Sequence, residues 1–193
     1  MTIFLILAPY GAFAALMLVT SAAISLFASA AICLAVVAYD MLGGHSIKML
    51  GAGSAMLFAA IGGYITLVDS SLSTPAVKLA VDVGVFAISL VSLAILRPFT
   101  LQYARELVDT ETTALPGFLR VNYIITVAWT AAFLLMMIAN VLMMYVPGLP
   151  LWSGLAIAFA ARNSAAYFTQ WYPQYRRAKF GPPTASASAL SGS

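Results

Sequence analysis

The fold of this chain is decided by the stretch that runs from Val121 to Ala161, VNYIITVAWTAAFLLMMIANVLMMYVPGLPLWSGLAIAFAA. No side chain in this stretch is charged, and the segment Pro147-Gly148-Leu149-Pro150 divides it into two apolar runs. An α-helix rises about 1.5 Å per residue, so about 20 apolar residues cross a hydrocarbon core of about 30 Å. Each run is therefore long enough to cross a membrane, with the proline-bounded segment as the turn between two crossings.

The composition of the whole chain indicates the same class of protein. Of its 193 residues, 63% are hydrophobic and 8% are charged, and the mean hydropathy is +0.99. Soluble domains carry about 25% charged residues. The pI is near 9.1, but the few basic residues lie between apolar runs, which argues against a nucleic-acid partner. The composition predicts an integral membrane protein whose first partner is the lipid bilayer.

Six apolar segments are candidates for membrane spans. Thr20 and Ser21 mark a reversal inside the uncharged stretch that begins the chain, and Ser73-Thr74-Pro75 offers a capping hydroxyl before a helix. Backbone polar groups find no water in hydrocarbon, so spans of this length form helices. The sequence predicts an all-α, polytopic protein with spans at Ile3–Val19, Ala22–Tyr39, Met49–Val68, Pro75–Leu96, Val121–Val146 and Leu151–Trp171.

The distribution of Lys and Arg predicts the orientation of these spans. Basic residues favour the cytoplasmic side of short loops. With six spans both termini share one side, and Lys78 alone lies on the other. We therefore expect both termini in the cytoplasm, on the side that carries Lys48, Arg97, Arg105, Arg120, Arg176, Arg177 and Lys179.

The chain divides at Tyr172 into two parts of different composition. We expect residues 1–172 to form the six-helix domain. Residues 173–193 begin with a basic cluster and continue with Gly, Pro, Ser and Ala, a composition typical of a disordered tail.

Three strongly polar side chains lie within predicted spans. Asp82, Asn140 and Arg162 fall at similar depths when residues are counted from the non-cytoplasmic ends of their helices. Polar groups at such depths are costly and tend to face the bundle interior and pair. We expect one cluster of the three. The alternatives are an exposed i,i+4 pair between Lys78 and Asp82, and an Arg162 side chain that reaches toward the headgroups.

The longest polar connection runs from Arg97 to Arg120. Phe99, Tyr103 and Leu107 recur at helical spacing, which predicts an amphipathic interfacial helix between the fourth and fifth spans. Such a helix is either a docking element or a stiff connector. The candidate docking residues are Arg97, Phe99, Gln102, Tyr103, Arg105 and Glu106.

A stripe of small residues marks the third span. Gly51, Ala55, Ala59 and Gly63 recur every fourth position, which predicts a flat face for close helix packing. The face could pack within the chain or against a second copy in a homo-oligomer.

Catalytic patterns are not found in the sequence. The single histidine, His45, cannot build a His-based metal site, and no HExxH, GxSxG or P-loop pattern is present. The sequence therefore predicts a non-enzymatic protein without a metal or organic cofactor.

The order of these features resembles the bacterial intracellular septation protein A family. The resemblance rests on the segment Arg97-Pro98-Phe99-Thr100-Leu101-Gln102-Tyr103-Ala104-Arg105-Glu106 and on Asn122, Trp129, Phe133, Ala139, Asn140 and Pro147, with Pro9, Gly62 and Gly63 in support. It implies a multi-pass protein of the bacterial inner membrane that contributes to cell division and envelope synthesis through protein contacts.

Two other functions remain open at this point. A small transporter or channel would use Asp82, Asn140 and Arg162 as an intramembrane site. An accessory subunit of a larger membrane complex would differ from the septation-type protein only in its partner.

Overall fold

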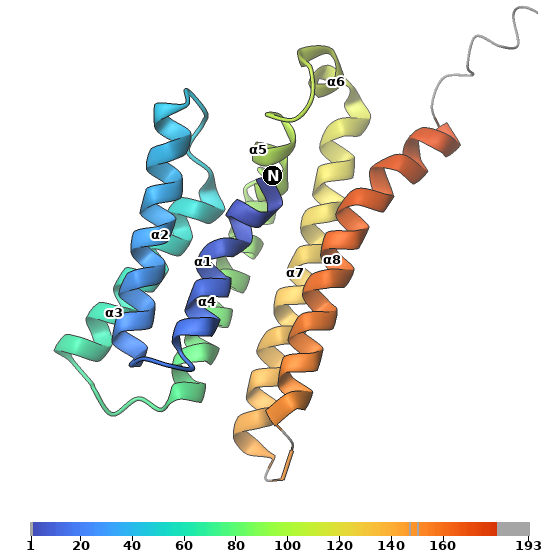
Figure 1. The fold of residues 1–193 in the computed structure, drawn as a ribbon. Helices are drawn as coiled ribbons and strands as arrows, with labels where there is room; N and C mark the ends of the chain where they lie inside the picture. Colours follow the sequence, from blue (N-terminus) through green and yellow to red (C-terminus); the bar gives the residue numbers. More distant parts are fainter. Residues whose placement is uncertain (1, 147, 150, 181–193) are drawn as a thin grey trace, which may run out of the picture.

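The computed structural model describes residues 2–146, 148–149 and 151–180, and these ranges contain only helices and their connections. The long helices run side by side (Figure 1). In chain order the helices are α1 (Thr2–Leu16), α2 (Ala22–Leu42), α3 (Met49–Leu67), α4 (Thr74–Ala94), α5 (Phe99–Ala104), α6 (Thr110–Ala114), α7 (Pro116–Tyr145) and α8 (Leu151–Phe180).

The helices pack mainly against their neighbours in the chain. α1 packs against α2, α2 against α3, and α3 against α4. α4 then packs against α7, and α7 against α8, so that α4 joins the first three helices to the last pair (Figure 1). The short helix α5 contacts α7 at one end of the bundle.

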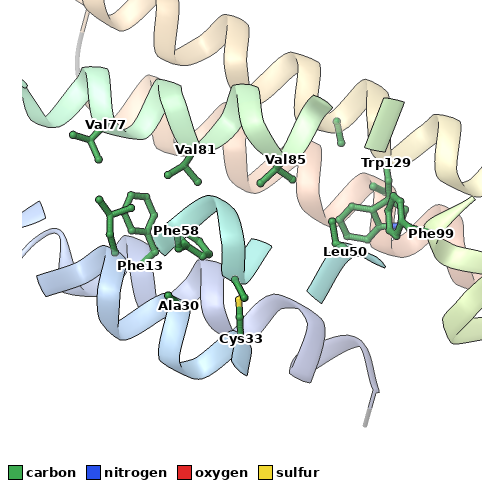
Figure 2. Packing of buried hydrophobic residues seen from close by; sticks show 14 of the residues in the cluster. Phe13, Ala30, Cys33, Leu50, Phe58, Val77, Val81, Val85, Phe99 and Trp129 are labelled. Carbon is green, nitrogen blue, oxygen red and sulfur yellow. The ribbon is translucent and has the colours of Figure 1, made fainter. Parts of the chain in front are cut away.

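The apolar core runs through α1–α4 and continues onto α5, α7 and α8, and one part of it lies between α1, α3 and α4. Val77, Val81 and Val85 recur every fourth residue along α4 and are at most 4% exposed. They face Phe13 and Phe58, whose ring centroids lie 5.5 Å apart (Figure 2). Residues at this spacing share one helix face, so a single stripe of valines holds α1 and α3 against α4.

The predicted helix breaks at Thr20-Ser21 and before Pro75 are confirmed. The Ser21 hydroxyl accepts a hydrogen bond from the Ile24 N–H at 3.4 Å and caps α2. The Ser73 hydroxyl caps α4 in the same way, through the Ala76 N–H at 3.4 Å. α7 ends at Tyr145 and α8 begins at Leu151; Pro147 and Pro150, between them, lie outside the described residues.

Four helices in the described ranges are long and apolar enough to cross a membrane: α2, α3, α4 and the Gly117–Tyr145 part of α7. The protein is therefore a helical membrane protein. α1 has 15 residues and rises about 22 Å, less than a hydrocarbon core of about 30 Å. In α8, Arg162 and Asn163 interrupt the apolar run.

The connection between α4 and α7 differs from the single amphipathic helix that its spacing predicts. α5 has only six residues, and Leu107, which should lie on the apolar face, is 67% exposed. The Asp109 carboxylate accepts a hydrogen bond from the Thr112 N–H at 2.7 Å and starts the separate helix α6. An N-cap residue is not helical, so no single helix runs through Asp109.

The last helix extends beyond the predicted end of the transmembrane domain. α8 continues through Pro173 to Phe180, so the predicted boundary at Tyr172 falls inside a helix. Arg177 and Lys179 lie in its last turn, where positive charge complements the partial negative charge of a helix C-terminus. The remainder of the predicted disordered tail, residues 181–193, lies outside the described residues.

Candidate functional site

Two members of the predicted polar cluster are in direct contact. Asp82 lies on α4 and Asn140 on α7, two helices that pack against each other. The Asn140 amide donates a hydrogen bond to Asp82 Oδ2. This contact places a carboxylate and an amide together between two membrane-spanning helices, where each satisfies part of the other's hydrogen-bonding capacity.

Arg162 joins Asp82 and Asn140 from across a cavity instead of through direct contact. Within the described residues no ion pair links Arg162 to Asp82, but the two side chains interact electrostatically and line the same cavity. Lys78, one turn before Asp82, also lies within electrostatic range of the carboxylate. The three predicted residues thus form a contact pair with a nearby guanidinium group.

The cavity has a volume of about 650 Å³ and extends between α4, α5, α7 and α8. Its polar floor contains Asp82, Arg162 and Tyr10, and its other end is lined by Arg176 and Arg177. Most of the wall between these ends is apolar. Pockets of about 300–1,000 Å³ with a few polar groups are the usual size for small-molecule sites.

Tyr10 belongs to the cavity floor, although its sequence context gave no signal for this. Its hydroxyl shares a hydrogen bond with Ser54 Oγ of α3, and its ring lies 5.8 Å from that of Phe58. The side chain also interacts electrostatically with Arg162. α1 therefore contributes a phenol to the floor, in addition to closing the apolar core.

A hydrogen bond that the sequence did not predict joins α7 to α8 beside the cavity. The Trp129 indole N–H donates to Thr169 Oγ1 at 2.9 Å, and Trp129 is 6% exposed. Its ring lies 5.9 Å from that of Phe133, which in turn lies 6.4 Å from Phe99 (Figure 2 shows Trp129 beside Phe99). Aromatic side chains from α5 and α7 thus form one continuous wall.

Hydroxyl groups hold α4, α5 and α7 together beside this wall. Ser89 Oγ and Thr130 Oγ1 lie 2.6 Å apart, and Thr100 Oγ1 lies 2.7 Å from Thr126 Oγ1. Thr100 also donates to the Asn122 carbonyl at 2.9 Å. Buried hydroxyls in hydrocarbon need partners, and here both hydroxyl pairs join different helices, while Thr130 also donates to the Thr126 carbonyl of its own helix at 2.8 Å.

The predicted docking segment is held to the bundle by Lys48. This lysine is 4% exposed and lies 2.7 Å from Asp40 and 2.9 Å from Glu106. Its ammonium group also lies 5.4 Å from the centre of the Tyr103 ring. Lys48 thereby joins the end of α2, the start of α3 and the segment after α5.

The charges around Lys48 decide its protonation state. Burial alone lowers the pKa of a lysine, but the hydrogen bonds and negative charges of Asp40 and Glu106 outweigh this effect and raise the pKa of Lys48. The neighbouring Tyr103 hydroxyl has a raised pKa, chiefly because it is buried. The group therefore contains a protonated lysine and a neutral phenol at neutral pH.

The structure divides the predicted docking residues into two sets. Phe99 is buried, and the Gln102 side-chain carbonyl accepts a hydrogen bond from the Met49 N–H at 2.6 Å. With Tyr103 and Glu106 beside Lys48, four of the six residues face the bundle. Arg97 and Arg105 are exposed.

The predicted small-residue stripe on α3 is split between two environments. A Cβ on Gly51 would lie 3.5 Å from Val37 of α2, and Ala55 is 5% exposed. Ala59 is exposed, and a Cβ on Gly63 would meet no atom within 4 Å. The closest glycine contact involves α4 instead, where a Cβ on Gly84 would lie 2.2 Å from Leu57 Cδ1.

Comparison of the chain with known protein families, curated proteins and solved structures gives no match. Within the described residues, no three His, Cys, Asp or Glu side chains lie together as a candidate metal site. The fold and the cavity define a helical membrane protein with an internal polar cluster.

Proposed function

We propose that the protein is a six-span membrane protein of the bacterial inner membrane, with both termini in the cytoplasm. α8, and α1 together with the turn residues 17–19 that continue it, supply the two spans beyond the four that meet the length and hydropathy requirement. The distribution of Lys and Arg supports this orientation. α5 and the segment after it, which contact the ends of α2 and α3, then lie at the cytoplasmic interface as a short amphipathic element.

Within this topology the protein acts as a small transporter or channel whose intramembrane site is formed by Asp82, Asn140 and Arg162. The cavity carries this proposal, because it connects the level of Asp82 and Arg162 with the end of the bundle that bears Arg176 and Arg177. A route from one membrane face to a polar site inside the bundle is what binding of a solute during transport requires.

Cysteine accessibility in phosphatidylcholine nanodiscs tests this function. Replacing Cys33, the single cysteine, with Ser gives a background for Met136→Cys in the cavity wall and Leu135→Cys, whose native side chain is 51% exposed on the outside of α7. A charged methanethiosulfonate reagent needs water and a thiolate. We expect it to modify Met136→Cys and to leave Leu135→Cys unmodified.

The same experiment identifies the route to the site. Gly117 lines the cavity at the α6 end, and a Cβ there would meet no atom within 4 Å, so we expect Gly117→Leu to be tolerated and to narrow this end of the cavity. Gly117→Leu should slow the modification of Met136→Cys by at least several-fold. An unreactive Met136→Cys in a folded protein would refute the transport site.

A second candidate function is the non-enzymatic, septation protein A type of role. The observation that favours it is the anchoring of the segment after α5 by Lys48, which leaves Arg97 and Arg105 exposed on a fixed element. In this role the protein contributes to cell division and envelope synthesis by binding membrane protein partners. An accessory subunit of a larger complex would use the same surface.

Site-specific crosslinking in cells tests the second function. A photoreactive residue at Arg105 should give a discrete crosslinked product, and the same residue at Leu135 should crosslink only to lipid. The double change Arg97→Glu and Arg105→Glu should abolish the product and lengthen the cells, whereas Lys78→Glu at the other membrane face should do neither. Normal cell length in the double variant would argue against a role in division.

A further inference from the structure

One face of α7 forms a continuous apolar wall along the cavity. The residues that line it recur three or four positions apart, so they share one side of the helix. They are Phe118, Val121, Ile125, Trp129, Phe133 and Met136. A hydrocarbon chain buries apolar surface against a wall of this kind.

The basic end of the cavity carries the features of a membrane interface. Arg176 and Arg177 line it, and the Asp109 carboxylate lies within electrostatic range of Arg177. On the same turns of α8, Trp171 and Tyr175 stack with their ring centroids 5.1 Å apart and are 42% and 40% exposed. Such aromatic side chains mark the headgroup level, and guanidinium groups there attract anionic lipid headgroups.

The cavity is longer than the hydrocarbon of one bilayer leaflet. Arg162 lies fourteen residues before Arg176 on α8, a rise of about 21 Å. One leaflet contributes about 15 Å of hydrocarbon, half of a core of about 30 Å. An acyl chain that starts at Arg176 therefore passes Trp129, at the level of Thr169, and ends before it reaches the polar floor.

From these observations we propose that the cavity binds a membrane lipid with an anionic headgroup. The headgroup lies against Arg176 and Arg177, and one acyl chain lies along the apolar face of α7. This inference rests on the proposed membrane topology and names the occupant of the apolar part of the cavity that leads to the proposed transport site, an anionic amphiphile. The polar floor at Asp82 and Arg162 lies beyond the end of the chain.

Fluorescence quenching by lipids with brominated chains tests the proposal. The chain contains three tryptophans, and Trp152→Phe with Trp171→Phe leaves Trp129, in the cavity wall, as the single reporter. In maltoside micelles, brominated phosphatidylglycerol should quench Trp129 at lower molar ratios than brominated phosphatidylcholine. One basic residue near a membrane surface contributes enough attraction for a change of about fivefold, so Arg177→Gln should reduce the preference by about that factor.

Lys179→Gln is the matched control. It also removes one positive charge, two residues after Arg177, but Lys179 does not line the cavity. It should leave the preference unchanged, and Gly117→Leu should abolish the quenching by either lipid. Inorganic phosphate should not relieve the quenching, since a free anion provides no chain for the apolar wall.

Two outcomes would overturn the proposal. Equal quenching by the two lipids would show that the cavity does not select an anionic headgroup. Loss of quenching in Arg162→Gln but not in Arg177→Gln would show that the headgroup binds at the polar floor instead. The two experiments distinguish a wrong lipid assignment from a wrong transport site. If Met136→Cys reacts with the charged reagent while brominated phosphatidylglycerol shows no preference, the site remains and the lipid assignment is wrong.

Discussion

The ammonium group of Lys48 lies 2.9 Å from the Glu106 carboxylate, although the two residues are separated by the whole of α3, α4 and α5. Asp40 completes the group at 2.7 Å from the same nitrogen. This contact determines how the segment after α5 lies on the bundle, and therefore which of its side chains are exposed.

Replacing Lys48 should destabilise the protein strongly. Lys48→Met leaves two carboxylates facing each other at a largely buried position, and removal of one partner from a buried ion pair costs about 3–5 kcal/mol. Denaturant-induced unfolding in detergent would measure the loss. Lys179→Met, on the surface of α8, should cost less than about 1 kcal/mol, and the triple change with Asp40→Asn and Glu106→Gln should recover most of the stability.

The contribution of Lys48 should be insensitive to pH over the neutral range. The folded-state pKa of Lys48 is raised above the unfolded value, so its stabilisation is fully present below the unfolded pKa of about 10.4 and is lost as the pH rises through the folded pKa. The difference in unfolding free energy between the wild type and Lys48→Met should therefore be equal at pH 7 and pH 9. A difference that disappears by pH 9 would contradict the assigned direction of the shift.

Adding a side chain at Gly84 should destabilise the packing of α3 against α4. Because Leu57 Cδ1 and Cγ would lie 2.2 and 2.9 Å from an added Cβ, Gly84→Ala requires the whole leucine side chain to move, at a cost of about 1–3 kcal/mol. Gly63→Ala has open space and should be neutral or stabilising by up to about 1 kcal/mol, because alanine favours the helix. Equal unfolding midpoints for the two variants would show that α3 and α4 are less closely packed than described.

Asp82 and Arg162 should be energetically coupled. Asp82→Asn and Arg162→Gln each remove one charge from the cavity floor, and the double variant should be more stable than the sum of the single effects predicts, by about 1 kcal/mol. A double-mutant cycle on the free energy of unfolding measures this interaction free energy between Asp82 and Arg162. Asp82→Asn combined with Arg105→Gln, an exposed and distant residue, should be additive.

The contact between α7 and α8 should depend on the Thr169 hydroxyl. Thr169→Val removes the acceptor of the Trp129 indole N–H, and an unsatisfied buried donor costs about 1–3 kcal/mol. Thr169→Ser retains the hydroxyl and should behave as the wild type in unfolding and in the emission maximum of Trp129. An unchanged Thr169→Val variant would mean that the indole finds another acceptor.

The sequence alone determined the features that depend on local chemistry. The reversal at Thr20-Ser21 and the helix start after Ser73 follow from the sequence, because a serine in extended backbone can accept a hydrogen bond from an N–H of the first helical turn. Counting residues along the helices also predicted that Asp82 and Asn140 share one level, because helix rise is constant and polar groups in hydrocarbon seek partners.

Only the tertiary structure decided the features that depend on contacts between distant segments. Lys48 looks in the sequence like a basic loop residue, and its burial follows from where α5 meets the ends of α2 and α3. The amphipathic spacing after Arg97 predicted a longer helix, because hydrophobic periodicity alone does not register the local cap that Asp109 forms with Thr112. The cavity likewise depends on how α8 packs against α7 and on the side chains that α1 and α5 place beside it, and hydrophobic periodicity within one helix cannot determine such relations between helices.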